Sequence, residues 1–373
     1  MRNILQLPTL LGFALLTSFL PAGLIAQEHN DSHSAAAETV GEHSAEEAHH
    51  AEEEFNAIEM IMEHISDANE WHILTYQSDG HEQHVSIPLP VILWDGEWHF
   101  FMSSAAAHGH VHAGYTMEHG VIVSTEGKER AALADLFNGL DGKFVDLSIS
   151  KNVAGILISC ILLLLVFTGV NRAYKKHNGV PKGIAGFMEP VVLFIRDDVA
   201  LPNIGEKKAD RFLPLLLTIF FFIWFNNLLG LIPIFPGGTN VTGNIAVTMV
   251  LALITLVVVN VNGNKDYWGH VFWPPGVPLL LKIIIIPVEI LGLFTKPFAL
   301  MMRLFANITA GHIMILSLIS LVFIFKSIAI GPASVLLALF ISVLELLVAA
   351  LQAYIFTVLT ALFIGMSVQE HHH

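Results

Sequence analysis

The chain has 373 residues, of which 54% are hydrophobic and only 13% are charged, and its mean hydropathy is +0.64. This composition is typical of a membrane protein. No basic, aromatic-rich patch accompanies the net charge of −14, which excludes a nucleic-acid-binding protein. The single cysteine, Cys160, excludes an internal disulfide and provides no metal-binding spacing.

The charge is distributed unevenly along the chain. Residues 27–146 hold 23 Asp and Glu against three Lys and Arg, a charge of −20. From residue 147 onward there are nine acids against 14 Lys and Arg, a charge of +5, and Arg2 supplies the remaining +1. An acidic, water-facing front is therefore joined to a mildly basic membrane body.

Residues 1–26 are predicted to be a secretory signal peptide. Arg2 stands near the start, an apolar run begins at Ile4, and small residues surround the expected cleavage site at Ala26–Gln27. An uncleaved anchor is the alternative, because the apolar run is long for a signal core. In both cases the next segment is exported.

Residues 27–70 form an acidic, His-rich, low-complexity segment in which disorder or a loose helix is expected. Fourteen histidines lie between His29 and His119. A solvated tract is favoured over metal binding, since the histidines have no regular ligand spacing.

Residues 71–146 are predicted to form a small β-rich extracytoplasmic element. Three short β-prone runs occur here, at Trp71–Tyr76, Val85–Trp94 and Trp98–Met102. Asp95-Gly96 separates the last two and is a hairpin signal.

Residues 147–370 are predicted to form an all-α polytopic membrane domain. Its five transmembrane segments are Val153–Val170, Leu213–Ile234, Ile245–Val261, Ile283–Phe325 and Val335–Met366. The last two are too long to stand upright in a hydrocarbon core of about 30 Å, so each either breaks or is strongly tilted. The run Phe187–Ile195 is predicted to be an interfacial helix.

Loop charges predict the orientation. The connection between the first two spans carries eight Lys and Arg, which places it in the cytoplasm, whereas the connection Pro236–Asn244 is uncharged. The N-terminus is therefore expected outside, in the periplasm, and the C-terminus in the cytoplasm.

Arg303 lies within the apolar stretch Leu291–Phe325. A charge at the centre of a bilayer costs about 2.5–3.5 kcal/mol by insertion scales, so such residues usually face a protein interior or a wet pathway and mark function. A guanidinium cannot lose its proton in a protein. A permanent cation at this depth can force a passing carboxylate to ionise.

Helical spacing arranges other polar residues around Arg303. Residues seven apart differ by about 20° in angle and about 10 Å in height, so Glu289, Lys296 and Arg303 share one face, and Asn307 continues it. His312 lies farther out, roughly on the opposite side. In the antiparallel final helix, Glu345 and Gln352 also share a face. If Gln352 lies beside Arg303, Glu345 comes close to His312 in the outer half of the membrane, and Glu289 lies alone in the inner half. Polar groups on both sides of a fixed cation predict two half-channels, one on each side of Arg303.

These motifs resemble subunit a of F-type ATP synthase. The resemblance covers residues 147–370 and rests on Leu300–Asn307 with Ala310-Gly311, on Glu345 with Leu351–Thr360, and on Glu289, Lys296-Pro297, Asn227 and Pro233. It implies that Arg303 is the essential arginine and Gln352 its neighbour. It further implies outer half-channel roles for Asn307, His312 and Glu345 and an inner one for Glu289.

The chain also departs from the family pattern. Many bacterial members have a carboxylate at the position of His312 and a histidine at that of Glu345, and Gly230 replaces an outer-channel acid. The acidic N-terminal extension is atypical of the family. Simpler roles stay open at this point, namely an ion pair for Arg303, pairing of Glu289 or Glu345 with Lys282 or Lys326, a core role for His312, interhelical hydrogen bonds for Gln352 and Asn307, and lipid contact for Lys296.

The predicted function is the proton-conducting stator of a rotary ATP synthase in a bacterial inner membrane. The resemblance implies a ring of two-helix subunits (subunit c), a stalk subunit b, the soluble head and lipid as partners. We expect a non-catalytic subunit without cofactor, metal or nucleotide site, since no Gly-rich phosphate loop is present. Coupling to protons or to sodium stays open. A cation or metal transporter with a metal-capturing His-rich front is the alternative.

Overall fold

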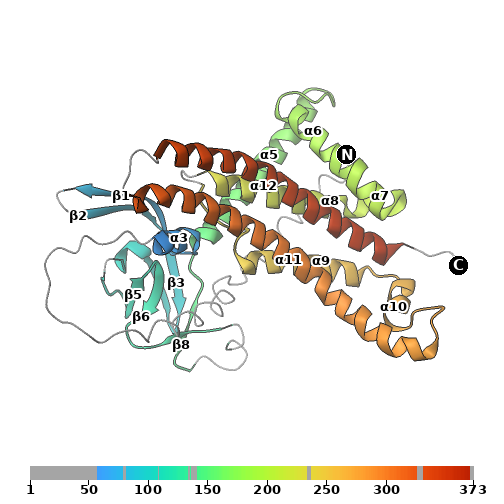
Figure 1. The fold of residues 1–373 in the computed structure, drawn as a ribbon, viewed down its shortest axis with the longest axis horizontal. Helices are drawn as coiled ribbons and strands as arrows, with labels where there is room; N and C mark the ends of the chain where they lie inside the picture. The colour runs from blue at the N-terminus through green and yellow to red at the C-terminus, as the bar shows by residue number, and fades with distance from the viewer. Residues whose placement is uncertain are drawn as a thin grey trace. The chain divides into compact units, whose positions relative to one another are not determined.

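A computed structural model describes residues 57–78, 81–107, 109–132, 135, 141–232, 237–325 and 331–369 (Figure 1). The predicted signal peptide and most of the acidic, His-rich segment lie outside the described residues. The described chain divides into two compact units. The first contains residues 155–308 and 345–369, and the second contains residues 57–154 and 309–344. The two longest helices contribute to both.

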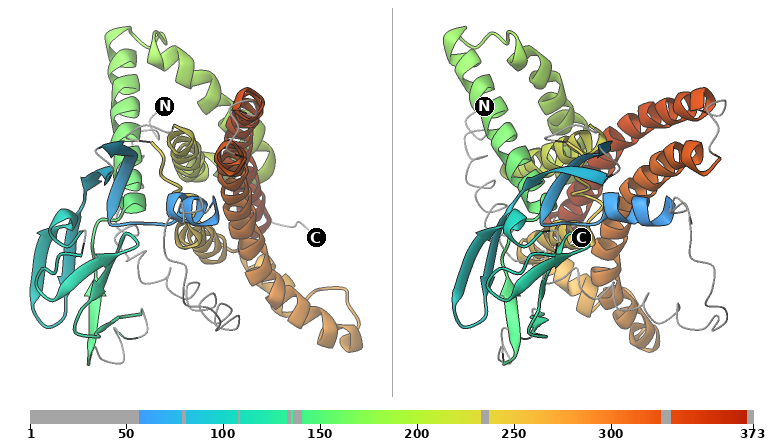
Figure 2. Two further views of the ribbon diagram at one scale, coloured as in Figure 1. Left: turned by 60° about the vertical axis from the view of Figure 1, so that its left-hand side comes forward. Right: turned by 90° about the vertical axis from the view of Figure 1, so that its left-hand side faces the viewer.

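The second unit contains the extramembrane domain, which begins with helix α3 (Ala57–Ile65). An antiparallel pair follows, β1 (Glu70–Ser78) with β2 (His81–Pro88), and a separate antiparallel pair is formed by β5 (Tyr115–Glu118) and β6 (Val121–Ser124). The predicted β-rich element is therefore present, and Figure 2 shows its strands from two further sides.

A four-stranded sheet in the order β4-β3-β8-β7 forms the centre of this domain. Its strands are β3 (Pro90–Trp94), β4 (Trp98–Met102), β7 (Glu129–Arg130) and β8 (Lys143–Asp146). The predicted hairpin at Asp95-Gly96 is confirmed, with Trp94 paired to Trp98. The β-prone run Val85–Trp94 forms strand structure but is divided between β2 and β3 at Leu89, because Pro88 and Pro90 lack the N–H that a continuous ladder needs.

Hydrogen bonds to Asp95 link the β3–β4 hairpin to the rest of the domain. Its carboxylate accepts hydrogen bonds from Lys128 Nζ at 2.7 Å, from Tyr115 Oη at 3.0 Å and from the His99 ring at 2.9 Å. The bond from the Lys128 ammonium lowers the pKa of Asp95, and burial raises the pKa of Tyr115 to about 12. Tyr115 in turn packs edge-on against the buried Phe144, so the turn and the small core support each other.

The membrane domain contains apolar helices close to the predicted positions. Its helices are α5 (Lys151–Lys176), α6 (Ile184–Phe194), α7 (Leu201–Ile204), α8 (Glu206–Leu231), α9 (Ile245–Val261), α10 (Lys265–Phe272), α11 (Leu279–Ile324) and α12 (Gly331–Val368). A π-helical turn, Ile195–Ala200, connects α6 to α7. The helix expected over Phe187–Ile195 is therefore confirmed as a helix.

Three of these helices, α5, α8 and α12, are long and apolar enough to cross a membrane. A fourth span arises if α9 and α10, which meet at 105°, count as one broken span. The predicted number of five therefore stays a prediction. The two long helices do not break, since α11 runs for 46 residues and α12 for 38. Of the two alternatives, tilting is the one left, and it stays an expectation.

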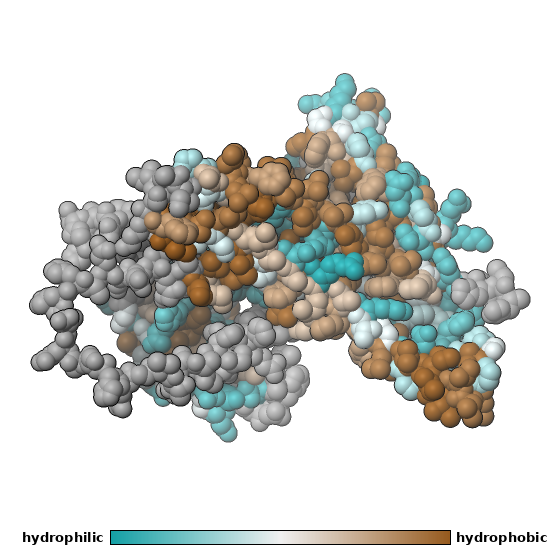
Figure 3. All heavy atoms as spheres, viewed as in Figure 1, coloured by the Kyte–Doolittle hydropathy of each residue, from teal (hydrophilic) through white to brown (hydrophobic). Residues whose placement is uncertain are grey.

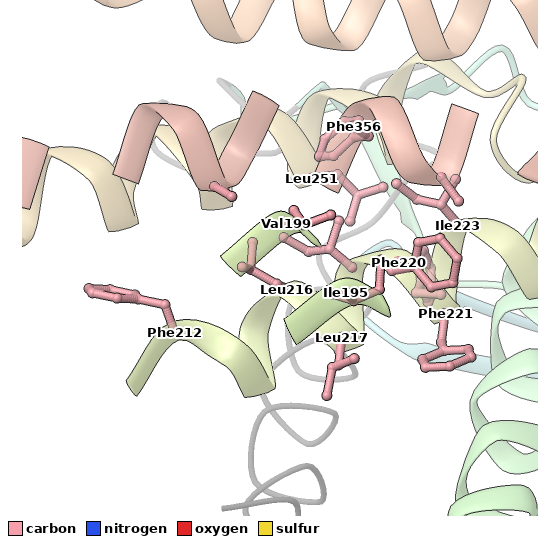
Figure 4. Packing of buried hydrophobic residues seen from close by; sticks show 14 of the residues in the cluster. Ile195, Val199, Phe212, Leu216, Leu217, Phe220, Phe221, Ile223, Leu251 and Phe356 are labelled. Atoms are coloured by element: carbon pink, nitrogen blue, oxygen red, sulfur yellow. The ribbon is translucent and has the colours of Figure 1, made fainter. Parts of the chain in front are cut away.

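The core of the first unit is built mainly by α8. Figure 4 shows its buried side chains, Phe220 and Phe221 among them, meeting Ile195 and Val199 of the π-helical turn, Leu251 of α9 and Phe356 of α12. Each buried aromatic side chain removes a large apolar area from solvent. This packing holds the middle of α12 against the core built by α8.

The cytoplasm-facing end expected for α12 is fixed by hydrogen bonds within the first unit. Asn264 Nδ2 and Lys208 Nζ each donate to the Val368 carbonyl at 2.6 Å, and the Asn264 N–H donates to the Ser367 carbonyl at 2.8 Å. These donors satisfy carbonyls that a helix end leaves without partners. Gly365 lets α12 lie directly on α7, because a side chain at this position would collide with the Asn203 carbonyl.

Candidate functional site

Arg303 lies on the exposed side of α11. A neighbouring side of the helix is buried through Leu300, Leu304 and Ile308, which join the core of the first unit at four-residue spacing. In the part of the chain that the structure describes, no ion pair reaches the guanidinium. The role of a structural ion-pair partner within this chain therefore has no support. Arg303 instead presents its charge outward.

Gln352 of α12 forms a hydrogen bond with the backbone of Arg303. It is buried, and its Nε2 donates to the Arg303 carbonyl at 3.2 Å, which joins the middle of α12 to the middle of α11. The sequence prediction that Gln352 lies beside Arg303 agrees with this contact. Because the amide contacts the backbone, it fixes the position of the arginine without neutralising the guanidinium.

A second buried amide, that of Asn227 in α8, forms a hydrogen bond with the backbone of α12 about one turn before Gln352. Its Nδ2 donates to the Ala349 carbonyl at 3.3 Å, and its Oδ1 accepts from Thr242 Oγ1 at 2.5 Å. Ala349 stands three residues before Gln352, so the same helical turn is held from two sides. The sequence interpretation singled out Asn227 and missed Thr242, whose only signal was an uncharged polar run between two spans.

The outward-facing strip of α11 carries three more predicted residues. Asn307, Lys296 and Glu289 are all exposed. The Lys296 ammonium lies 6.0 Å from the Phe363 ring centroid, near the outer limit of a cation–π contact. Figure 3 shows a hydrophilic patch interrupting the hydrophobic surface over α11 and α12.

The suggested pairing of Glu289 with Lys282 has no support. The Lys282 ammonium lies 4.0 Å from the Trp273 ring centroid, and no ion pair joins it to Glu289 among the described residues. An exposed acid in an apolar stretch is costly unless water or a partner meets it. The role of Glu289 in an inner half-channel therefore stays a prediction.

Glu345 and His312 lie in the parts of α12 and α11 that were predicted to be in the outer half of the membrane. Glu345 is buried and stands seven residues before Gln352, on the same face of α12. His312 is half-buried, and the Lys151 ammonium lies near enough for its charge to act on the imidazole. The two residues belong to different units, so their predicted pairing stays a prediction.

Comparisons with known proteins give the family of residues 153–365. The model of the ATP synthase A chain family matches residues 153–365, more than half of the chain. The chain belongs to this family. An ATP synthase subunit a from Chloroherpeton thalassium is 51% identical over 235 residues, which are 61% of this chain and 69% of that protein. Further relatives are an ATP synthase subunit a of Myxococcus xanthus (46% identical; 63% of this chain and 78% of the relative) and an ATP synthase subunit a 2 of Prosthecochloris aestuarii (44%; 73% and 85%).

The extramembrane domain has its own match. Residues 60–146 fit a family described only as a domain of unknown function (DUF8433). The family assignment for residues 153–365 therefore does not explain this domain. In the described part of the chain, no group of three or more His, Cys, Asp or Glu side chains is placed to hold a metal ion.

Proposed function

We propose that this subunit is the proton-conducting stator of a rotary ATP synthase. The observation that carries the proposal is Arg303, a permanent cation presented outward from α11 and held from behind by Gln352. A carboxylate on a rotating ring of small two-helix subunits is neutral where it faces lipid, because desolvation raises its pKa. Opposite Arg303 the same carboxylate ionises and releases its proton.

Two offset half-channels would carry protons to and from that point. Glu289, on the exposed strip of α11, lines the inner one, and Asn307, His312 and Glu345 belong to the outer one. The fixed charge of Arg303 between them repels a proton that would pass straight through. In this proposal the N-terminus is periplasmic, the C-terminus is cytoplasmic, a stalk subunit b holds the stator, and the soluble head makes the ATP.

A photo-crosslinking experiment tests the docking face. Ala299 is an exposed alanine one turn from Arg303 on the same side of α11, and Leu165 is an exposed residue of α5. Each is replaced by cysteine in a Cys160→Ala background and labelled with a benzophenone maleimide in native membranes. We expect label at position 299 to capture a small two-helix membrane subunit and label at 165 not to. Capture of lipid alone at 299, with an intact complex, would exclude this face.

The acidic front is expected to be auxiliary to transport. Residues 27–56 contain nine Asp and Glu and no Lys or Arg, and removing them leaves α3 and all the described strands in place. Exposed charges are screened beyond about 8 Å at physiological salt. We therefore expect a modest fall in turnover at low salt that disappears as salt rises, with normal assembly. Loss of assembled complex, or zinc bound tightly by the intact segment, would contradict this.

A further inference from the structure

Strand β4 forms one edge of the four-stranded sheet in the extramembrane domain. In the order β4-β3-β8-β7 it has a neighbour, β3, on one side only. Natural proteins usually protect such an edge with charged side chains, prolines or a bulge, because its free backbone groups can pair with another chain. Strand β4 contains no Lys, Asp, Glu or Pro, and its register with β3 has no bulge. Within the described sheet, this edge is therefore unprotected.

Two backbone hydrogen bonds show which residues of the β3–β4 hairpin are bonded to each other. The Ser103 N–H donates to the Leu89 carbonyl at 2.9 Å, and at the other end the Asp95 N–H donates to the Glu97 carbonyl at 3.3 Å. Both bonds fit the register of β3 with β4 when it is continued by one residue at each end. In an antiparallel ladder, hydrogen-bonded pairs alternate with pairs that exchange no hydrogen bond. Every second pair between these two ends is therefore hydrogen-bonded.

Trp98, Phe100 and Met102 consequently direct their backbone groups away from β3. The alternation assigns the bonds of the ladder to His99 and Phe101, so the N–H and C=O groups of the other three residues lie on the free edge. Outside the sheet, no hydrogen bond joins these groups to another described residue. Three residues of β4 thus offer a row of donors and acceptors to a further strand.

Large apolar side chains accompany these free backbone groups. Trp98 is 56% exposed, Phe100 67% and Met102 44%, and the rings of Trp98 and Phe100 stack with their centroids 5.8 Å apart. The three side chains lie on one face of β4, because successive side chains of a strand point to opposite faces, and Phe101 packs against the small core. A partner that covers this face gains free energy from the buried apolar area. The edge therefore combines a hydrogen-bonding template with an apolar surface, as sites for an added strand do.

The charge of the domain indicates what kind of strand fits the edge. Residues 57–146 contain 14 Asp and Glu against three Lys and Arg, a charge of −11. Glu97, next to Trp98, is exposed and forms no ion pair with a described residue, whereas Lys128 already pairs with Asp95. A segment that carries Lys or Arg is attracted to such a surface, and a second, equally acidic copy of the domain is repelled. Residues 27–56 of the same chain hold nine Asp and Glu and no Lys or Arg, so charge disfavours them as well.

We propose that the free edge of β4 binds an extended, basic segment of another protein chain, which adds a fifth strand to the sheet. The segment pairs with the backbone of Trp98, Phe100 and Met102, and apolar residues at every second position of the segment cover these three side chains. A Lys or Arg of the segment lies near Glu97. Lipid is a poorer partner, because it cannot satisfy the free backbone groups. The proposal does not depend on the stator function.

Fluorescence anisotropy with the purified, assembled complex tests the proposal. The probe is a short labelled peptide of alternating valine and lysine, and the comparison peptide alternates valine and glutamate. Phe100→Pro removes an outward N–H that the β3–β4 ladder does not use, and Phe100→Ser keeps the backbone but removes the ring. Val111→Pro is the matched control, because Val111 is a loop residue of the same domain that is 59% exposed and its N–H has no hydrogen bond to another described residue.

We expect the lysine peptide to bind the wild-type complex and the glutamate peptide not to bind. Phe100→Pro is expected to weaken binding about tenfold or more, since proline removes a donor and obstructs the approaching strand. Phe100→Ser weakens binding less, and Val111→Pro and Arg303→Ala leave it unchanged, which separates this test from that of the stator function. Absence of binding to the wild type, or equal affinity in Phe100→Pro, would overturn the proposal. If Phe100→Pro does not assemble, equal affinity in Phe100→Ser would overturn it.

Crosslinking in native membranes identifies the occupant of the edge. Trp98→Cys in a Cys160→Ala background is labelled with a benzophenone maleimide, and the captured peptide is sequenced by mass spectrometry. The expected product is a segment of another chain in which Lys or Arg accompanies alternating apolar residues, and its capture is expected to disappear when Phe100→Pro is added. Capture of a second copy of this chain, of residues 27–56 or of lipid alone would contradict the proposal.

Discussion

Replacing Arg303 with alanine is expected to reduce ATP-driven proton pumping to background while leaving assembly largely intact. The side chain is exposed and has no ion-pair partner among the described residues, so its removal leaves no buried charge behind. In the proposed function, the change removes the cation that makes a ring carboxylate give up its proton. The measurement is fluorescence quenching by a pH-sensitive dye in inverted vesicles, normalised to the assembled complex.

Lysine at position 303 is expected to fail as well. A lysine can neutralise itself in an apolar setting, and it lacks the planar fork with which a guanidinium meets a carboxylate. Gln352→Ala is the informative companion, since it removes the support of the Arg303 backbone but keeps the charge. It is expected to slow pumping without abolishing it. Pumping near the wild-type rate in Arg303→Ala would contradict the stator function.

Removing either His312 or Glu345 is expected to slow transport on the order of tenfold or more, and exchanging the two is expected to recover part of the loss. A positioned acid–base group contributes about 10²–10⁴ to proton transfer, and a closely coupled pair acts as one titrating unit. The exchange keeps one imidazole and one carboxylate in the same place, so it retains the chemistry that each single variant destroys.

The pairing stays a prediction from helical spacing, because His312 and Glu345 belong to different compact units. The comparison is between His312→Glu, Glu345→His and the double exchange, each at matched levels of assembled complex. A double exchange no faster than the slower single variant would show that the two side chains do not act together.

The sequence predicted the positions of the membrane helices better than the residues at which they begin and end. Helix α9 begins and ends at the predicted residues, because Asn244 caps it and its side chain accepts from the Ala246 N–H. Helices α5 and α8 extend beyond the predicted apolar segments, since Lys151 and Glu206 continue the helix although they end the hydrophobic run. Hydrophobicity identifies the part of a helix that can lie in lipid, whereas backbone hydrogen bonding continues past it.

The extramembrane domain was predicted only in part. The strands around Asp95-Gly96 carry alternating apolar residues and a strong turn, and they were found. The strands β5 to β8 are only two to four residues long and lie between loops, so no local pattern separates them from turns. The free edge of β4 was also beyond the sequence, because only the order of the strands shows which of them has a neighbour on one side alone.

Spacing along α11 and α12 was sufficient to place Gln352 beside Arg303, because both helices are regular. Arg303 was predicted to face a carboxylate of a partner ring, and its side chain is exposed in the described chain. Thr242, hydrogen-bonded to Asn227 across 15 residues, was beyond any local pattern.

The central claim is that a fixed positive charge at this point, rather than arginine at one sequence position, couples the ring to the two half-channels. Gln352 Nε2 lies 3.2 Å from the Arg303 carbonyl, so side chains at the two positions reach the same region. The most direct measurement is therefore ATP-driven proton pumping by complexes that combine Arg303→Gln with Gln352→Arg, compared with Arg303→Gln alone at equal assembly. Partial recovery of pumping in the double variant is the predicted result, and a double variant as inactive as the single one would contradict the claim.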